Sequence, residues 1–128
     1  MQKSAEKSMV NKDTTYSELV GILTTIFTEI LPKYGCTVRE KQIELAQKML
    51  EAIDKRAILL SEAGTGIGKT HAYLIAAVLA KYGHLNDLKL SGIYPELDYE
   101  SLSRLPIVIS TSSIALQRAI VREYIPQI

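Results

Sequence analysis

Residues 57–70 decide the fold of this chain, and they read AILLSEAGTGIGKT. The run opens with four apolar residues, 57–60, which are typical of a strand buried on both faces of a parallel sheet. A glycine-rich turn follows, and residues 69–82 then predict a helix that is apolar on nearly all sides. A second apolar run at residues 107–109 predicts another buried strand, followed by an amphipathic helix. This order of strand, helix, strand and helix predicts an α/β fold with a parallel sheet.

Two helices are predicted before this unit. Residues 14–31 carry apolar side chains at spacings of three and four, and Thr15 with Glu18 fits a capping box at the start. Residues 38–54 show the same periodicity, with Thr37 and Glu40 as a second capping box. We therefore expect an N-terminal tail and amphipathic helix in residues 1–36, and the start of a nucleotide-binding domain in residues 37–128.

The composition is that of one ordinary globular domain of 128 residues. Fifteen Lys and Arg stand against 14 Asp and Glu, so the net charge of +1 is too small to attract DNA or a membrane at long range. The single cysteine, Cys36, cannot form an intrachain disulfide, which favours a reducing compartment. No run is long enough for a membrane span, and the polar N-terminus does not resemble an export signal. The expected location is the cytoplasm, with no membrane partner.

The stretch after the first apolar run fits a phosphate-binding loop of the form [AG]-x-x-x-x-G-K-T. Its glycines let the backbone form a nest of N–H groups, and the helix that follows presents further free donors to an anion. Lys69 is expected to reach the β- and γ-phosphates of ATP, and the Thr70 hydroxyl to bind Mg²⁺, which makes these two the predicted catalytic residues. The predicted nucleotide-binding residues of the loop are Ala63, Gly64, Thr65, Gly66, Ile67, Gly68, Lys69 and Thr70. The alternative is a glycine-rich turn that binds nothing.

Two flanking patterns add to the loop. Arg39 and Gln42 lie one turn apart at the start of the second predicted helix, and a glutamine amide offers the donor and acceptor that an adenine edge needs. The alternative is that both are solvated residues on a helix surface. Downstream, Thr111 and Ser113 lie where a strand is expected to give way to a helix, and their hydroxyls could hold a DNA phosphate. The alternative there is a plain helix N-cap.

Together these patterns resemble the N-terminal part of DinG-type helicases, bacterial relatives of the XPD-type superfamily 2 DNA helicases. The resemblance rests on R-x-x-Q, then L-L-x-E-A-G-T-G-x-G-K-T-x-A-Y-L, then V-I-S-T-x-[ST]-x-x-L-Q, over residues 39–117. It implies a RecA-like domain that binds ATP and Mg²⁺, with Arg39 and Gln42 on the adenine and Thr111 and Ser113 on single-stranded DNA. The chain departs from the family pattern at Ile67 and His71, and in a longer insertion at residues 83–106. Ala63 stands where most phosphate-binding loops have their first Gly, which narrows the family.

Several parts of such a motor are not found in the sequence. No apolar run after the loop ends in the acidic residue that holds Mg²⁺ and orients water, so the chain alone is expected not to hydrolyse ATP. We therefore interpret the chain as an ATP-binding piece of a DNA helicase that ends after motif Ia. The iron–sulfur cluster of many XPD-like proteins would need four cysteines past residue 128, so Cys36 is a small buried or loop residue. His71 and His84 are expected to be structural or solvent-exposed.

Two other functions compete with the helicase interpretation. A nucleotide kinase or GTPase shares the phosphate loop, but the guanine-binding N-K-x-D motif is missing and arginines for a kinase lid are few. A non-enzymatic protein would bind a partner through the amphipathic helix of residues 14–31.

Overall fold

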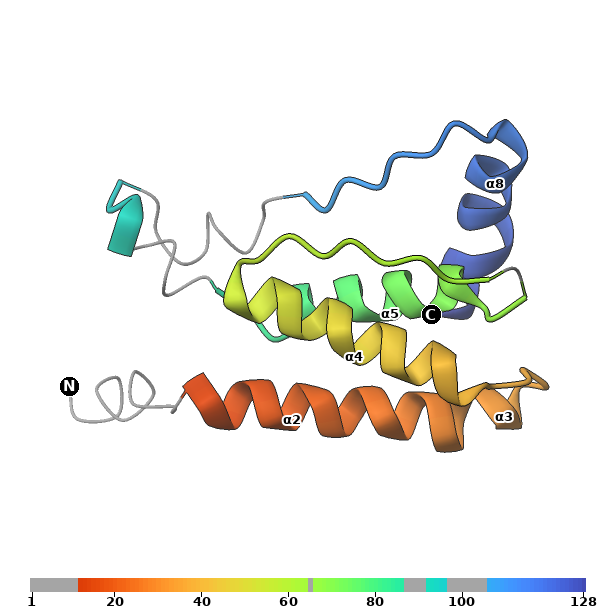
Figure 1. The fold of residues 1–128 in the computed structure, drawn as a ribbon, viewed down its shortest axis with the longest axis horizontal. Coiled ribbons are helices and arrows are strands. Elements are labelled where there is room, and N and C mark those ends of the chain that lie inside the picture. Colours follow the sequence, from red (N-terminus) through yellow and green to blue (C-terminus); the bar gives the residue numbers. More distant parts are fainter. Residues whose placement is uncertain (1–11, 65, 87–91, 97–105) are drawn as a thin grey trace.

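The computed structural model describes residues 12–64, 66–86, 92–96 and 106–128 (Figure 1). The N-terminal tail of residues 1–11, Thr65, and residues 87–91 and 97–105 of the predicted insertion lie outside the described residues. In chain order the elements are α2 (Lys12–Thr25), the π-helical turn η1 (Ile26–Ile30), α3 (Leu31–Lys33), α4 (Glu40–Lys55), α5 (Lys69–Tyr82), α8 (Ile114–Ala119), the π-helical turn η2 (Ile120–Tyr124) and the 3₁₀ turn η3 (Ile125–Gln127).

The first predicted helix is confirmed and is continuous through α2, η1 and α3. It begins at Lys12, before the predicted capping box, and its apolar stripe recurs every four residues at Leu19, Leu23, Phe27 and Leu31. An α-helix has 3.6 residues per turn, so side chains placed every four residues shift gradually around the helix axis. The π-helical turn η1 has more residues per turn than an α-helix, which reduces this shift and keeps the apolar stripe on one side of the helix.

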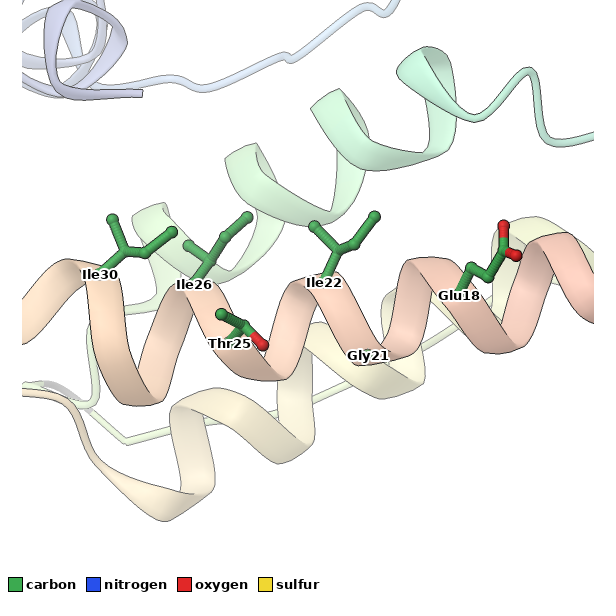
Figure 2. Close-up of a pocket in the computed structure, with 6 residues that line it drawn as sticks. All are labelled: Glu18, Gly21, Ile22, Thr25, Ile26 and Ile30. Atoms are coloured by element: carbon green, nitrogen blue, oxygen red, sulfur yellow. The ribbon is translucent and has the colours of Figure 1, made fainter.

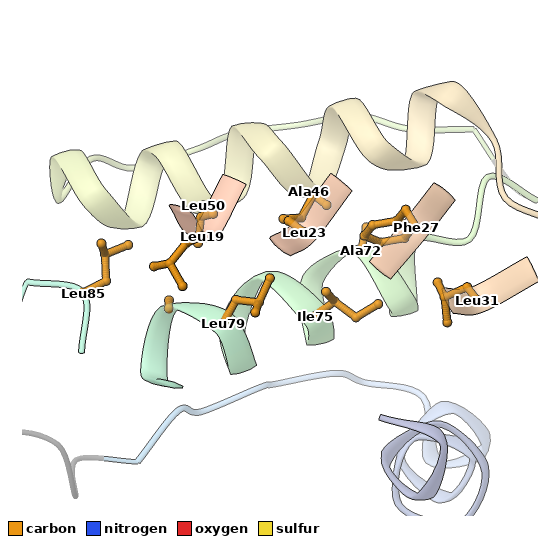
Figure 3. Packing of buried hydrophobic residues seen from close by; sticks show 11 residues of the cluster. Leu19, Leu23, Phe27, Leu31, Ala46, Leu50, Ala72, Ile75, Leu79 and Leu85 are labelled. Carbon is orange, nitrogen blue, oxygen red and sulfur yellow. The ribbon is translucent and has the colours of Figure 1, made fainter. Parts of the chain in front are cut away.

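The hydrophobic core lies between α2, α4 and α5, with the stripe of α2 facing the other two helices (Figure 3). Its buried members are Leu19, Leu23, Phe27, Leu31, Ala46, Leu50, Ala72, Ile75, Leu79, Ala80 and Leu85. The small residues of α4 and α5 let these helices approach each other closely. The core uses one apolar stripe of this helix, while Ile22 and Ile30 on its other side remain exposed.

The direction of the helices brings two helix starts together. In Figure 1, α4 and α5 run in the same direction and α2 runs opposite to them. After α4 ends, the chain therefore returns along residues 57–63 to begin α5 at the same end of the molecule where α4 began. The loop before α5 thus lies beside the first turn of α4.

The predicted α/β fold with a parallel sheet is wrong for the described residues. Neither predicted strand forms: residues 57–60 and 107–109 are coil, and no strand occurs in the described part of the chain. Ile58 and Leu60 are each 93 % exposed and Val108 is 83 % exposed. A strand exists only when another strand pairs with its backbone N–H and C=O groups. The apolar composition predicted burial, but the described residues supply no neighbouring strand, and the architecture is helical.

The remaining surface of α2 carries a shallow groove of about 430 Å³ (Figure 2). Its lining residues are Glu18, Gly21, Ile22, Thr25, Ile26 and Ile30. A second, larger hollow of about 690 Å³ lies between η1, α5 and η3, and the half-buried Cys36 is part of its wall. Cys36 is thus a half-buried structural residue, as expected. Among the described residues, no helix is both long and apolar enough to cross a membrane.

Candidate functional site: a glycine-rich loop at the start of a helix

The candidate site is the loop of residues 63–70, which ends in the first turn of α5. Two of its glycines adopt left-handed backbone conformations, Gly66 with φ +83° and Gly68 with φ +77°. Such conformations cost little for glycine and are unfavourable for residues with a side chain. Gly68 is the N-cap of α5 and provides no side-chain cap, so the first N–H groups of the helix keep free hydrogen-bonding capacity. The start of this 14-residue helix also carries a partial positive charge.

Lys69 folds back across the loop. Its Nζ donates a hydrogen bond to the Ala63 carbonyl at 2.8 Å, which joins the first and last parts of the loop. The side chain is exposed, so the ammonium group can also meet a ligand from solvent. Thr70 follows in the first turn of α5 and is half-buried. Thr65 is outside the described residues, so its predicted role remains a prediction.

Both upstream candidates, Arg39 and Gln42, lie beside this loop. Arg39 is the N-cap of α4, so the helix begins two residues later than predicted and the Thr37–Glu40 capping box is wrong. The Arg39 Nη1 atom lies 3.7 Å from where a side chain at Gly66 would begin. Arg39 is exposed, as the alternative of a solvated helix surface expected.

Gln42 does not fit the solvated-surface alternative, because it is only 4 % exposed. Its Nε2 donates a hydrogen bond to the Gly68 carbonyl at 2.9 Å, across 26 positions of the chain. Its Oε1 is buried and has no hydrogen-bond partner among the described residues. The sequence pattern placed Gln42 near a nucleotide but gave no sign of this contact with the loop.

A hollow of about 300 Å³ adjoins the loop on the side of α4. Its lining residues are Lys41, Glu44, Leu45, Lys48, Ser61, Glu62, Ala63, Gly64 and Ile67. The Lys48 ammonium lies 2.8 Å from the Glu44 carboxylate, and this hydrogen bond lowers the pKa of Glu44. Neither residue belongs to a motif of the sequence. Glu44 and Lys48 are four residues apart on a predicted helix, and this spacing alone indicates that the two side chains can pair.

The downstream candidates form a helix cap. The Ser113 Oγ accepts a hydrogen bond from the Leu116 N–H at 3.2 Å, which makes Ser113 the N-cap of α8. The Thr111 Oγ1 accepts from the Ser113 N–H at 3.2 Å, and the Thr111 carbonyl accepts from the Gln117 amide at 3.0 Å. The N-cap alternative is therefore confirmed as a structural role for Ser113. Both residues remain exposed enough to be reached by a ligand, with Thr111 half-buried.

Helix α8 and the turn η2 lie at the same end of the molecule as the loop (Figure 1). The turn η2 contacts α5 through Tyr124 and His71, whose ring centroids are 4.9 Å apart in an edge-to-face arrangement. Because the Nε2 of His71 is also buried, the prediction that this histidine is structural agrees with its position. His84 is exposed. The described residues contain no group of three or more His, Cys, Asp or Glu that could hold a metal ion.

Comparison with known proteins places this loop in a family context. The chain is 32 % identical over 71 residues to the probable ATP-dependent helicase YpvA of Bacillus subtilis, which is 56 % of this chain and 11 % of that protein. It is 32 % identical over 94 residues to the ATP-dependent helicase DinG of Mycobacterium tuberculosis, which is 73 % of this chain and 11 % of that protein. It is 49 % identical over 47 residues to the ATP-dependent DNA helicase YoaA of Escherichia coli, which is 37 % of this chain and 7 % of that protein.

No family model matches the chain, and no solved structure matches it at a significant level. The chain spans about a tenth of the length of the curated relatives that it matches. The resemblance that the loop and its flanking patterns indicate is nevertheless confirmed by three differently named helicases. The chain is therefore related by sequence to the DinG-type ATP-dependent helicases.

Proposed function

We propose that this chain binds ATP with Mg²⁺ at the loop of residues 63–70, as part of a DinG-like ATP-dependent DNA helicase. The observation that carries the proposal is the loop itself, with two left-handed glycines and Lys69 folded over it at the start of α5. Backbone N–H groups at a helix start bind anions because they are free donors in a region of positive potential. The relationship to helicases distinguishes this proposal from the kinase and GTPase alternatives.

Each residue type has a proposed task. The Lys69 ammonium leaves the Ala63 carbonyl and binds the β- and γ-phosphates as a compact cation. The Thr70 hydroxyl would provide an oxygen ligand to Mg²⁺, and the ion would neutralise part of the phosphate charge when bound. Arg39 and Gln42 are proposed for the adenine on the resemblance of the R-x-x-Q pattern, and both lie beside the loop.

The direct test removes the lysine charge. Lys69→Ala should weaken ATP binding about 10- to 150-fold, because it removes charge-assisted hydrogen bonds worth about 1.5–3 kcal/mol. Binding is measured by isothermal titration calorimetry in the presence of Mg²⁺. The matched control is Lys55→Ala, which removes the same charge at the far end of α4, where Lys55 pairs with Glu51 on an exposed surface. Equal ATP affinities of Lys69→Ala and the unchanged chain would contradict the proposed site.

We further propose that Thr111 and Ser113 contact a DNA phosphate. The support is their position before α8, at the same end of the molecule as the loop (Figure 1). Each contact would be weak and independent of base sequence, because phosphate contacts position a protein without reading the bases.

Ser113→Asp separates this proposed role from the helix cap. Aspartate is as good an N-cap as serine, so thermal stability should stay within about 0.5 kcal/mol of the unchanged chain. The added negative charge should repel a DNA phosphate and weaken binding of single-stranded DNA several-fold, measured by fluorescence anisotropy at low salt. Ser113→Asn keeps the cap without the charge and serves as the control. Undiminished DNA binding by Ser113→Asp would show that Ser113 only caps the helix.

A further inference from the structure

The contact between Gln42 and the loop suggests a role beyond base recognition. Gln42 is the third residue of α4, and a glutamine side chain that is 96 % buried must have a packed or hydrogen-bonded role. Its amide donates to the Gly68 carbonyl at 2.9 Å. A Cβ atom at Gly68 would lie only 2.2 Å from the Gln42 Nε2, so the amide rests directly on the backbone of the turn.

The bonded carbonyl has a defined place in the loop. Gly68 O also accepts the N–H of Ala72 at 3.3 Å, which is the first backbone hydrogen bond of α5. The Gly68 C=O and the Lys69 N–H belong to one planar peptide unit, and in a trans peptide they point in opposite directions. A donor that holds the carbonyl therefore also fixes the direction of the Lys69 N–H. That N–H is among the free donors at the helix start that would meet a phosphate.

We propose that Gln42 is a positioning residue of the phosphate loop, which holds the Gly68–Lys69 peptide so that the loop binds the polyphosphate chain whatever base is attached. The inference rests on the proposed function, because it requires that the loop binds phosphate. It differs from the adenine-reading role, in which loss of Gln42 would change the preference for ATP over GTP and leave phosphate binding unchanged. The buried Oε1 agrees with the new role, since solvent does not reach it in this conformation.

The probe is inorganic tripolyphosphate with Mg²⁺, which has the phosphates of ATP and no base. Gln42→Met keeps the length and volume of the side chain but cannot donate to the Gly68 carbonyl. Its tripolyphosphate affinity should fall about 5- to 50-fold, measured by calorimetry on the 128-residue chain. The thermal midpoint is measured on the same samples, and Gln47→Met on the same helix is the control for the substitution itself.

A second variant tests the hydrogen bond rather than the packing. Gln42→Glu has nearly the shape of glutamine, but an ionised carboxylate only accepts hydrogen bonds and would repel the Gly68 carbonyl. Protonation restores one donor. Burial at position 42 should raise the pKa of the carboxyl above its ordinary value, so the tripolyphosphate affinity, taken relative to the unchanged chain at each pH, should recover as the pH falls from about 8 to about 5. The negative charge of the carboxylate also repels the phosphates directly, so this recovery supports the positioning role only together with weaker binding by the neutral variant Gln42→Met.

The outcomes separate the two proposals. The positioning role is supported if Gln42→Met and Lys69→Ala both bind tripolyphosphate more weakly than the unchanged chain. It also requires that the affinity of Gln42→Glu recovers at low pH. The positioning role is overturned if both Gln42 variants bind tripolyphosphate within twofold of normal. If Lys69→Ala still weakens that binding, the proposed function stands. No binding of ATP or tripolyphosphate by the unchanged chain overturns both. If Gln42→Met does not fold, Gln42→Asn takes its place, because it is a neutral amide that is one methylene too short to reach the Gly68 carbonyl. Tripolyphosphate affinity of Gln42→Asn within twofold of normal counts against the inference.

Discussion

Replacing Phe27 by alanine is expected to lower the free energy of unfolding by about 3–5 kcal/mol. Phe27 is fully buried in the cluster that joins α2, α4 and α5, and it is the largest side chain in that cluster with no exposed surface (Figure 3). Its removal loses the transfer energy of an aromatic ring and leaves a cavity that helix backbones cannot easily fill. A loss of this size is a large part of the total stability of a small domain.

Urea denaturation followed by far-ultraviolet circular dichroism measures this effect. The control is Ile30→Ala, one turn further along the same helix, where the side chain is 41 % exposed and lines the groove of Figure 2. The control should lose only about 1 kcal/mol, because less apolar surface is transferred to water. Similar losses for the two variants would mean that the stripe of α2 does not form the core described here.

Gly68→Ala is expected to weaken ATP binding about 30- to 5,000-fold. Alanine in the left-handed conformation at φ +77° costs about 1–2 kcal/mol. Its Cβ would also lie 2.2 Å from the Gln42 Nε2, so the buried amide must move and lose its bond to the Gly68 carbonyl, which costs about 1–3 kcal/mol. The sum of about 2–5 kcal/mol gives the expected range. The upper end of this range exceeds the loss of about 10- to 150-fold expected from removing the Lys69 charge.

A double variant separates the two causes. Gly68→Ala combined with Gln42→Ala removes the steric conflict but keeps the backbone strain, so it should bind ATP more tightly than Gly68→Ala alone if the conflict dominates. Gly21→Ala is the control, because a Cβ at this position in α2 meets no atom within 4 Å. ATP affinity of Gly68→Ala equal to that of the unchanged chain would show that the loop does not bind phosphate in the described conformation.

The sequence by itself determined the features that depend on neighbouring residues in the chain. Apolar spacing predicted α2 and α4, and the apolar run after the glycine-rich turn predicted α5, because a helix satisfies its own backbone hydrogen bonds without a distant partner. The glycines of the loop predicted its conformation, because only glycine adopts left-handed angles at little cost. The R-x-x-Q, G-K-T and S-T-x-S patterns also predicted the relationship to helicases, since they combine residue types at fixed spacing.

Only the tertiary structure decided the features that depend on distant partners. The apolar runs at residues 57–60 and 107–109 favour strands, yet a strand needs a neighbour for its backbone, and the described residues provide none. The burial of Gln42 against Gly68 follows from two helices starting at one end of the molecule, which no local pattern encodes. Ser113 likewise suits a helix cap or a phosphate contact equally well by residue type, and its hydrogen bond to Leu116 became visible only once α8 was placed. In each case the same side chain fits two environments, and the free energy of its distant contacts selects between them.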